Sequence, residues 1–151
     1  MLNQIRTSLE QEYYKVTLKT ETIDGQVYEQ LLVSLIFQDH PNIPQLELYL
    51  MFLPGVEKEL NEVSILQYYT GFTTGVTNED KIIKIKNVIN ELNKTMPIGH
   101  FGYNEFDKSI FIKYSQTLQN EFDQAVEKQI KTIINALSFQ ISTSFNQFGL
   151  D

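Results

Sequence analysis

The sequence contains no cysteine and no tryptophan, and it has fewer basic than acidic residues. Without cysteine, disulfide frameworks, thiolate zinc sites and thiol nucleophiles are excluded, and nothing marks an oxidising compartment. With 12 Lys and Arg against 19 Asp and Glu, the formal net charge is −7. Nucleic-acid affinity comes mostly from cations that displace counterions, so this balance disfavours nucleic acid as a partner. For the same reason we expect no binding to anionic membrane surfaces.

Long apolar runs are also absent. The most apolar stretch, Leu46–Leu53, contains Glu47 and is far too short to span a bilayer. Met1–Gln11 has no continuous apolar stretch of the kind that a secretory signal needs. We therefore expect a cytoplasmic protein. No repeat and no Pro/Gly/Ser-rich linker interrupts the 151 residues, so the sequence predicts one domain over residues 1–151.

Residue patterns that carry catalytic or metal chemistry are scarce. The only histidines, His40 and His100, are far apart in the sequence and lack a paired metal-ligand spacing. Gly71–Gly75 and Gly99–Gly102 lack the spacing of phosphate-binding loops, and we interpret them as turn or bulge glycines. The carboxylates are numerous, but sequence alone cannot pair them for acid–base work. We predict no catalytic residue, no cofactor and no metal site.

In the first half of the chain, the spacing of apolar residues predicts a short helix followed by three strands. Apolar residues at helical spacing over residues 2–9 indicate the helix, and from Tyr13 the period changes to two. Asp24-Gly25 predicts a type I′ hairpin turn. A second strand follows from about Val27 to Gln38. Leu46–Leu53 is apolar on both faces, which is typical of a strand in the centre of a sheet.

The second half contains one ambiguous segment, a helix and a hairpin. Ser64–Phe72 is rich in β-forming residues but does not alternate cleanly, so we expect an edge strand or an extended segment. Thr77-Asn78-Glu79-Asp80 resembles a capping box and predicts the start of a helix. Pro97 ends this helix. Residues 98–104 and 109–116 predict a second hairpin.

The last predicted element is a long helix from Asn120, which can cap it, to about Gln147. Its apolar stripe consists of Phe122, Val126, Ile130, Ile133, Leu137, Ile141 and Phe145. Ile134, Phe139 and Phe148 lie off or beyond this stripe, so the C-terminal half of the helix needs a second apolar partner.

An aromatic cluster, Tyr68, Tyr69 and Phe72, permits two interpretations. These side chains cover one end of the sheet, or they form a patch that faces a partner, because tyrosine supplies a large contact area at low entropy cost. The residues that we predict to bind a partner are Tyr68, Tyr69, Phe72, Ile134, Phe139 and Phe148.

The order of the elements predicts an α+β fold, with an antiparallel sheet of about five strands covered by helices. Five segments carry a family resemblance: Leu46–Leu50, Ile65–Tyr69, Leu92–Lys94, Pro97–Gly102 and Ile110–Tyr114. They resemble the YbjN family, whose members are also described as bacterial sensory transduction regulators. The matching positions are apolar and small residues rather than reactive groups.

This resemblance implies the fold of type III secretion chaperones, which are small, acidic and commonly dimeric proteins that hold extended segments of client proteins. It also implies a bacterial, non-enzymatic, chaperone-like or regulatory domain that binds a protein partner and forms a homodimer. The alternative is a small-molecule sensor or an uncharacterised enzyme. For that alternative we expect a partly polar pocket between sheet and helices, converging on His100, Tyr103 or Tyr114.

Overall fold

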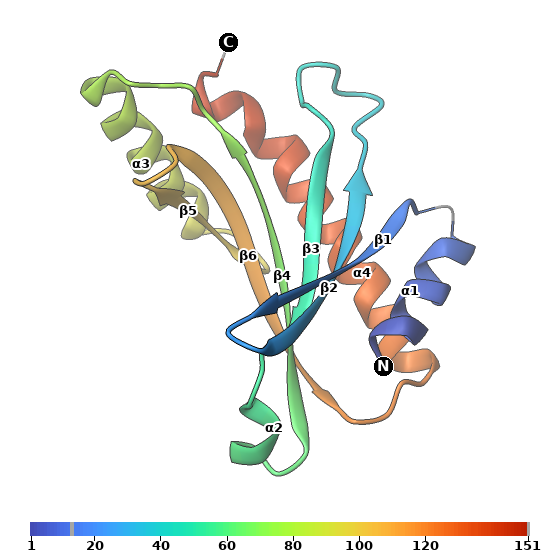
Figure 1. Cartoon of the computed structure of the whole chain (residues 1–151). Helices are drawn as coiled ribbons and strands as arrows, with labels where there is room; N and C mark the ends of the chain where they lie inside the picture. Colours follow the sequence, from blue (N-terminus) through green and yellow to red (C-terminus); the bar gives the residue numbers. More distant parts are fainter. Residues whose placement is uncertain (13, 151) are drawn as a thin grey trace.

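The chain forms a six-stranded antiparallel sheet with helices packed on one face (Figure 1). The computed structural model describes residues 1–12 and 14–150; Tyr13, where the sequence predicts the change of period, and Asp151 lie outside the described residues. The elements are α1 (Leu2–Gln11), β1 (Val16–Ile23), β2 (Gln26–Leu35), β3 (Leu46–Phe52), α2 (Val56–Glu59), β4 (Val63–Thr73), α3 (Glu79–Asn93), β5 (His100–Asn104), β6 (Ser109–Gln119), α4 (Gln124–Ser144) and the 3₁₀ helix η1 (Phe145–Phe148). The predicted α+β class is confirmed.

The strands lie in the order β1-β2-β3-β4-β6-β5, and every neighbouring pair is antiparallel. β3 and β4 are therefore the central strands, and β1 and β5 are the two edges. The prediction that Leu46–Leu53 belongs in the middle of the sheet is confirmed.

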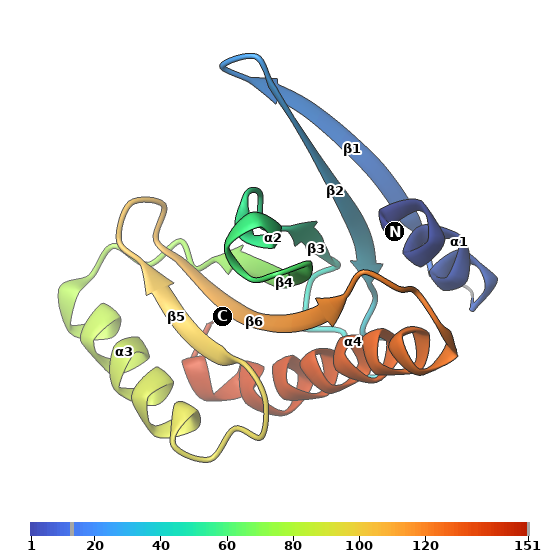
Figure 2. The same ribbon diagram turned by 90° about the horizontal axis from the view of Figure 1, so that it is seen from below.

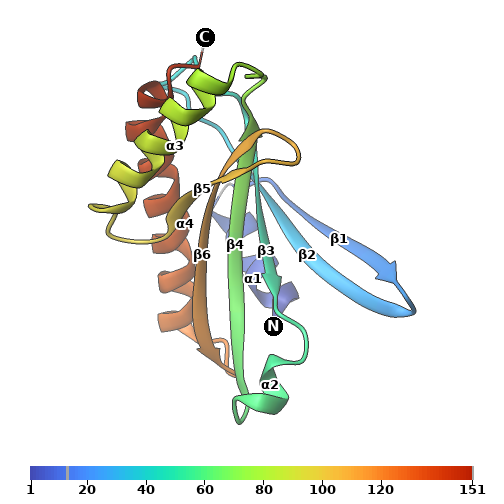
Figure 3. The same ribbon diagram turned by 90° about the vertical axis from the view of Figure 1, so that its left-hand side faces the viewer.

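The helices α3 and α4 lie on one side of the sheet (Figure 3), and α1 packs against α4, β1 and β2. The other side carries no long helix within the described residues, and the β1–β2 hairpin projects toward that side (Figure 2). The core fills the layer between sheet and helices, because alternate residues of each strand point into it. Its fully enclosed members from the strands include Leu31, Val33, Leu48, Leu50, Leu66, Ile110 and Ile112. From α4 it takes Ile130, Ile134, Leu137 and Ile141.

β4 corrects the expectation of an edge strand or extended segment at 64–72. It is a central strand of 11 residues, paired with β3 on one side and with β6 on the other. Leu66 and Tyr68 are buried against the helices, while Ile65 and Tyr69 are half-buried on the opposite face. Because both faces carry large apolar side chains, the strand lacks the clean alternation of a half-exposed one.

The helix starts are also shifted from their predicted positions. Asn78, rather than Thr77, caps α3, and its side chain accepts a hydrogen bond from Lys81 N at 3.1 Å. Asp123, rather than Asn120, caps α4, and it accepts from Val126 N at 2.8 Å. Several side chains near each start can accept this bond, so composition locates a helix start only to within a few residues.

The C-terminal end of the chain departs from a continuous α-helix. α4 ends at Ser144, and the 3₁₀ helix η1 follows, in which residues three apart lie above one another. This geometry puts Phe145 and Phe148 together against Phe72, with ring centroids 5.1 and 6.2 Å away. Within α4, Ile134 is enclosed and Ile133 is half-buried, so the stripe runs through 134 rather than 133.

Candidate functional site

The uncovered face of the sheet carries an apolar centre, which we call the open face. Cross-strand pairing places Leu32 opposite Tyr49 and Tyr49 opposite Tyr69, and alternation along the strands adds the other members. The open face consists of Leu32, Tyr49, Met51, Ile65, Tyr69 and Phe111. All six side chains are half-buried, and within the described residues no helix lies over them.

Aromatic packing fixes the shape of the open face. The rings of Tyr69 and Phe111 are stacked, with centroids 5.4 Å apart and planes 25° apart. His100 meets the edge of Phe111 at 6.4 Å. The Phe111 ring lies over Gly102 of the next strand, where a Cβ atom would stand 2.2 Å from the ring. Glycine at 102 therefore allows the ring to lie flat across β5.

The two neighbouring tyrosines of β4 have different surroundings. Burial, and secondly the negative charge of Asp107, raise the pKa of Tyr69 on the open face. Burial raises the pKa of Tyr68 much further on the helix side, where its hydroxyl donates to Gln116 Oε1 at 2.8 Å. Both hydroxyls are neutral at pH 7, so Tyr69 offers a partner a neutral hydrogen-bonding group.

A groove lies between the last part of β6 and α4. β5 pairs with β6 only as far as Lys113, so the edge of β6 beyond that residue has no neighbouring strand within the described residues. Lys108 O accepts from Thr74 N, which follows β4, and by alternation the backbone groups of Ser115, Thr117 and Gln119 point away from β4. The hollow has a volume of about 590 Å³, and Tyr114, Ala125, Lys128 and Ile133 are among its lining residues.

A second hollow, of about 640 Å³, lies between α3 and the C-terminal residues. Val76, Ile85, Val88, Phe148 and Leu150 supply its apolar lining. Lys81 and Lys84 are exposed and also line it, so this hollow combines apolar walls with positive charge.

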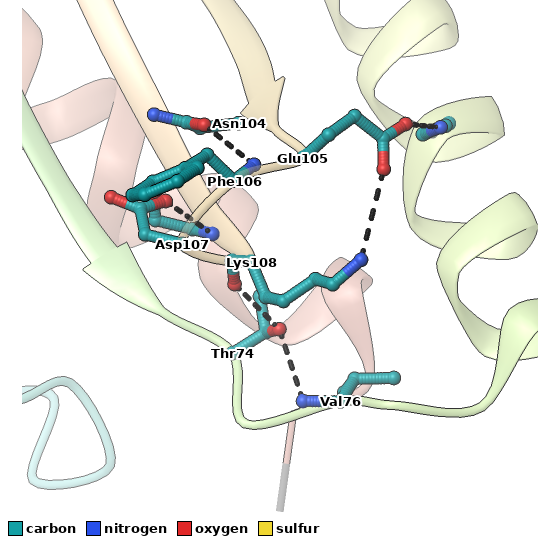
Figure 4. A network of polar contacts seen from close by, with 9 residues as sticks. Thr74, Val76, Asn104, Glu105, Phe106, Asp107 and Lys108 are labelled. Carbon is teal, nitrogen blue, oxygen red and sulfur yellow. Dashed lines mark hydrogen bonds and ion pairs between the residues drawn. The ribbon is translucent and has the colours of Figure 1, made fainter.

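The β5–β6 turn is held by a network of polar contacts (Figure 4). Thr74 donates from its backbone N–H and its hydroxyl to Lys108 O, at 3.0 and 2.9 Å. Glu105 forms an ion pair with Lys86 of α3, which lowers the pKa of the Glu105 carboxyl. The turn is thereby fastened both to the strand β4 and to the helix layer, while Phe106 at its tip is 96% exposed.

The six residues predicted to bind a partner do not form one surface. Tyr68, Ile134 and Phe148 belong to the core, and Phe72 is half-buried against Phe145 and Phe148. Tyr69 lies on the open face. Phe139 is 64% exposed on α4, where it lines a small hollow together with Ile36.

The structure also places the three residues expected at a small-molecule pocket, His100, Tyr103 and Tyr114. His100 lies on the open face, Tyr103 lies beside Lys86 of α3, and Tyr114 lines the groove between β6 and α4. Asn93 of α3 bonds to β5: its Nδ2 donates to Phe101 O at 2.9 Å, and its Oδ1 accepts from Phe101 N at 2.8 Å.

Among the described residues, no group of three or more His, Cys, Asp or Glu side chains is placed to hold a metal ion. Within the same residues, no helix has the length and apolar character needed to cross a membrane. The chain matches no protein-family model and no curated protein sequence.

The main site residues that sequence analysis missed are Tyr49 and Phe111. A signal for Tyr49 is present, because it alternates with the buried leucines of its strand and so must face the other side. Whether that other side is covered depends on where the helices pack, and local sequence does not contain this information.

Proposed function

We propose that this chain is a non-enzymatic, chaperone-like or regulatory domain of the YbjN type that binds an extended segment of another protein on its open face. The observation that carries the proposal is that the middle of the sheet is aromatic and apolar on the face that no helix of the described residues covers. Exposed contiguous apolar surface rimmed by polar groups is typical of protein-interaction sites.

The open face contains the residue types that usually supply most of the binding energy in a protein interface. Tyrosine and phenylalanine are rich in contact area, and stacking between Tyr69 and Phe111 holds their rings before a partner arrives. Lys113 pairs with Tyr69 across the strands, and Glu47 lies near the other end, where it accepts from Ser34 Oγ at 3.1 Å. An apolar centre with charges of both signs around it suits an extended polypeptide that has both apolar and charged side chains.

The same proposal includes a homodimer. Its support is the size and acidity of the chain, the resemblance to commonly dimeric proteins, and the apolar open face. Sedimentation at micromolar concentration measures the oligomeric state directly, and a monomer at and above that concentration contradicts this part of the proposal.

Affinity capture with mass spectrometry tests the binding function, using the wild type beside two variants. In the first, Tyr49→Ser and Tyr69→Ser together remove the aromatic centre of the open face. In the matched control, Phe139→Ser removes an exposed aromatic side chain from α4. We expect the wild type and the control to retain one specific protein, and the open-face variant to bind it at least about thirtyfold more weakly.

Three results contradict the proposal. A wild type that captures no specific protein under several growth conditions contradicts protein binding itself. Loss of the captured protein by Phe139→Ser alone moves the site to α4. Turnover of a compound by the purified wild type in an unbiased metabolite screen contradicts the non-enzymatic assignment.

A further inference from the structure

The outer edge of β1 is a row of unpaired backbone groups. Ser34 N donates to Lys15 O at 3.0 Å, and the register places Thr17 opposite Leu32. Because antiparallel pairing alternates, the odd-numbered residues of β1 bond to β2, and the even-numbered ones direct their N–H and C=O groups away from the sheet. Within the described residues no strand lies beyond them.

Several protections that natural sheets use at their edges are missing from β1. The strand is eight residues long, contains no proline or glycine, and stays in register with β2 along its whole length. Its last residues, from Lys19 onward, are exposed. A long regular edge of this kind is a template for pairing with another chain.

The charges of β1 suit pairing with a second copy of the same strand. Lys19 and Glu21 lie two residues apart on one face, with Nζ and Oε1 2.6 Å apart. When two β1 strands pair antiparallel about a twofold axis at Thr20, Lys19 of each copy lies opposite Glu21 of the other. Shifting the axis by one residue places Lys19 against Lys19, or Glu21 against Glu21, and like charges directly opposite each other are destabilising.

We propose that a second copy of this chain pairs through β1 in the register centred on Thr20, which joins the two sheets into one continuous sheet. The proposal rests on the homodimer of the proposed function and names the surface that forms it. The interface is isologous, as a twofold dimer requires: the same strand on both copies, with Leu18 opposite Thr22 and Thr20 opposite itself.

Charge reversal tests the register. In sedimentation experiments, Lys19→Glu and Glu21→Lys each place two pairs of like charges across the interface, and we expect dimer dissociation constants raised about tenfold or more. The double variant Lys19→Glu/Glu21→Lys restores opposite charges, so its dissociation constant should return to within a few-fold of the wild type. Lys84→Glu, at an exposed position of α3, changes the net charge as Lys19→Glu does, and it serves as the control for that variant.

Mixing the two single variants gives a result that misfolding cannot imitate. The Lys19→Glu copy has two acidic residues at these positions, and the Glu21→Lys copy has two basic ones. A heterodimer of the two has opposite charges at every contact, so an equimolar mixture should dimerise although neither variant does so well alone.

A cross-link tests the centre of the interface, and the chain has no other cysteine to interfere. Thr20→Cys should form a disulfide between two copies on mild oxidation, whereas Val27→Cys, which is also exposed and lies near the hairpin tip, should not. A monomeric wild type overturns both this inference and the homodimer. If the wild type is a dimer, but charge reversal leaves its dissociation constant unchanged and Thr20→Cys does not cross-link, the β1 interface is wrong while the homodimer is retained.

Discussion

The two outer hairpins of the sheet differ in how the backbone groups of their edge strands are hydrogen-bonded. At the β5–β6 hairpin, Asn93 of α3 occupies both outward backbone groups of Phe101, and Thr74 and Lys86 fasten the turn. At the β1–β2 hairpin, a two-residue turn closes the strands, and the tip projects from the molecule (Figure 2). Within the described residues no strand pairs with the outer edge of β1. The difference shows that one side chain can occupy the outward backbone groups at the middle of an edge strand, and that within the described residues β1 has no such partner.

The largest effect should come from opening the closed edge. Asn93→Ala removes two hydrogen bonds from Phe101, which is 2% exposed, so its backbone N–H and C=O lose their partners. We expect the free energy of unfolding to fall by about 2–4 kcal/mol in chemical denaturation. Asn90→Ala, exposed on the same helix, should change it by less than about 0.5 kcal/mol. Equal effects of the two variants would show that Asn93 does not close the edge.

Proline at two threonines of β1 separates its bonded side from its bare side. Thr17 directs its N–H to β2, so Thr17→Pro breaks a ladder bond and should reduce the free energy of unfolding by about 1–3 kcal/mol. Thr20 directs its N–H outward, where proline is tolerated in edge strands, so Thr20→Pro should cost distinctly less. Denaturation at concentrations that keep both variants monomeric measures the difference. If Thr20→Pro is the more damaging change, our assignment of the outward residues is reversed.

The smallest effect concerns the tether at the β5–β6 turn. The hydrogen bond from Lys86 lowers the pKa of Glu105 below its ordinary value of 4.5. The tether is therefore fully present above pH 4.5 and is lost as the pH falls through the lowered pKa. Carbon-13 NMR of the carboxyl should show this low pKa, and Lys86→Met should return it toward the ordinary value. An unchanged titration in Lys86→Met would mean that the ion pair does not form in solution.

Local patterns predict much of this fold. The turn at Asp24-Gly25 follows from the need for positive φ, and the two residues have φ of 51° and 78°. The stripe of α3, with Ile82, Ile85 and Ile89 buried, follows from helical spacing. In these cases the information lies within a few neighbouring residues, so no knowledge of the rest of the molecule is needed.

The candidate site could be predicted only in part, because it depends on contacts distant in sequence. Tyr68 and Tyr69 are neighbours of the same type, yet one is in the core and the other on the open face. Their assignment depends on which side of β4 the helices cover. Asn93 closes β5 because the chain returns beside α3, and nothing in residues 93–95 indicates this role.

The uncovered face also sets conditions for handling the protein. Molecules with exposed apolar surface stay dispersed while electrostatic repulsion keeps them apart, and the charge of −7 at pH 7 provides that repulsion. It vanishes near the isoelectric point of about 4.8. Acidic buffers should therefore turn a clear sample cloudy, and storage at neutral or mildly alkaline pH should preserve it.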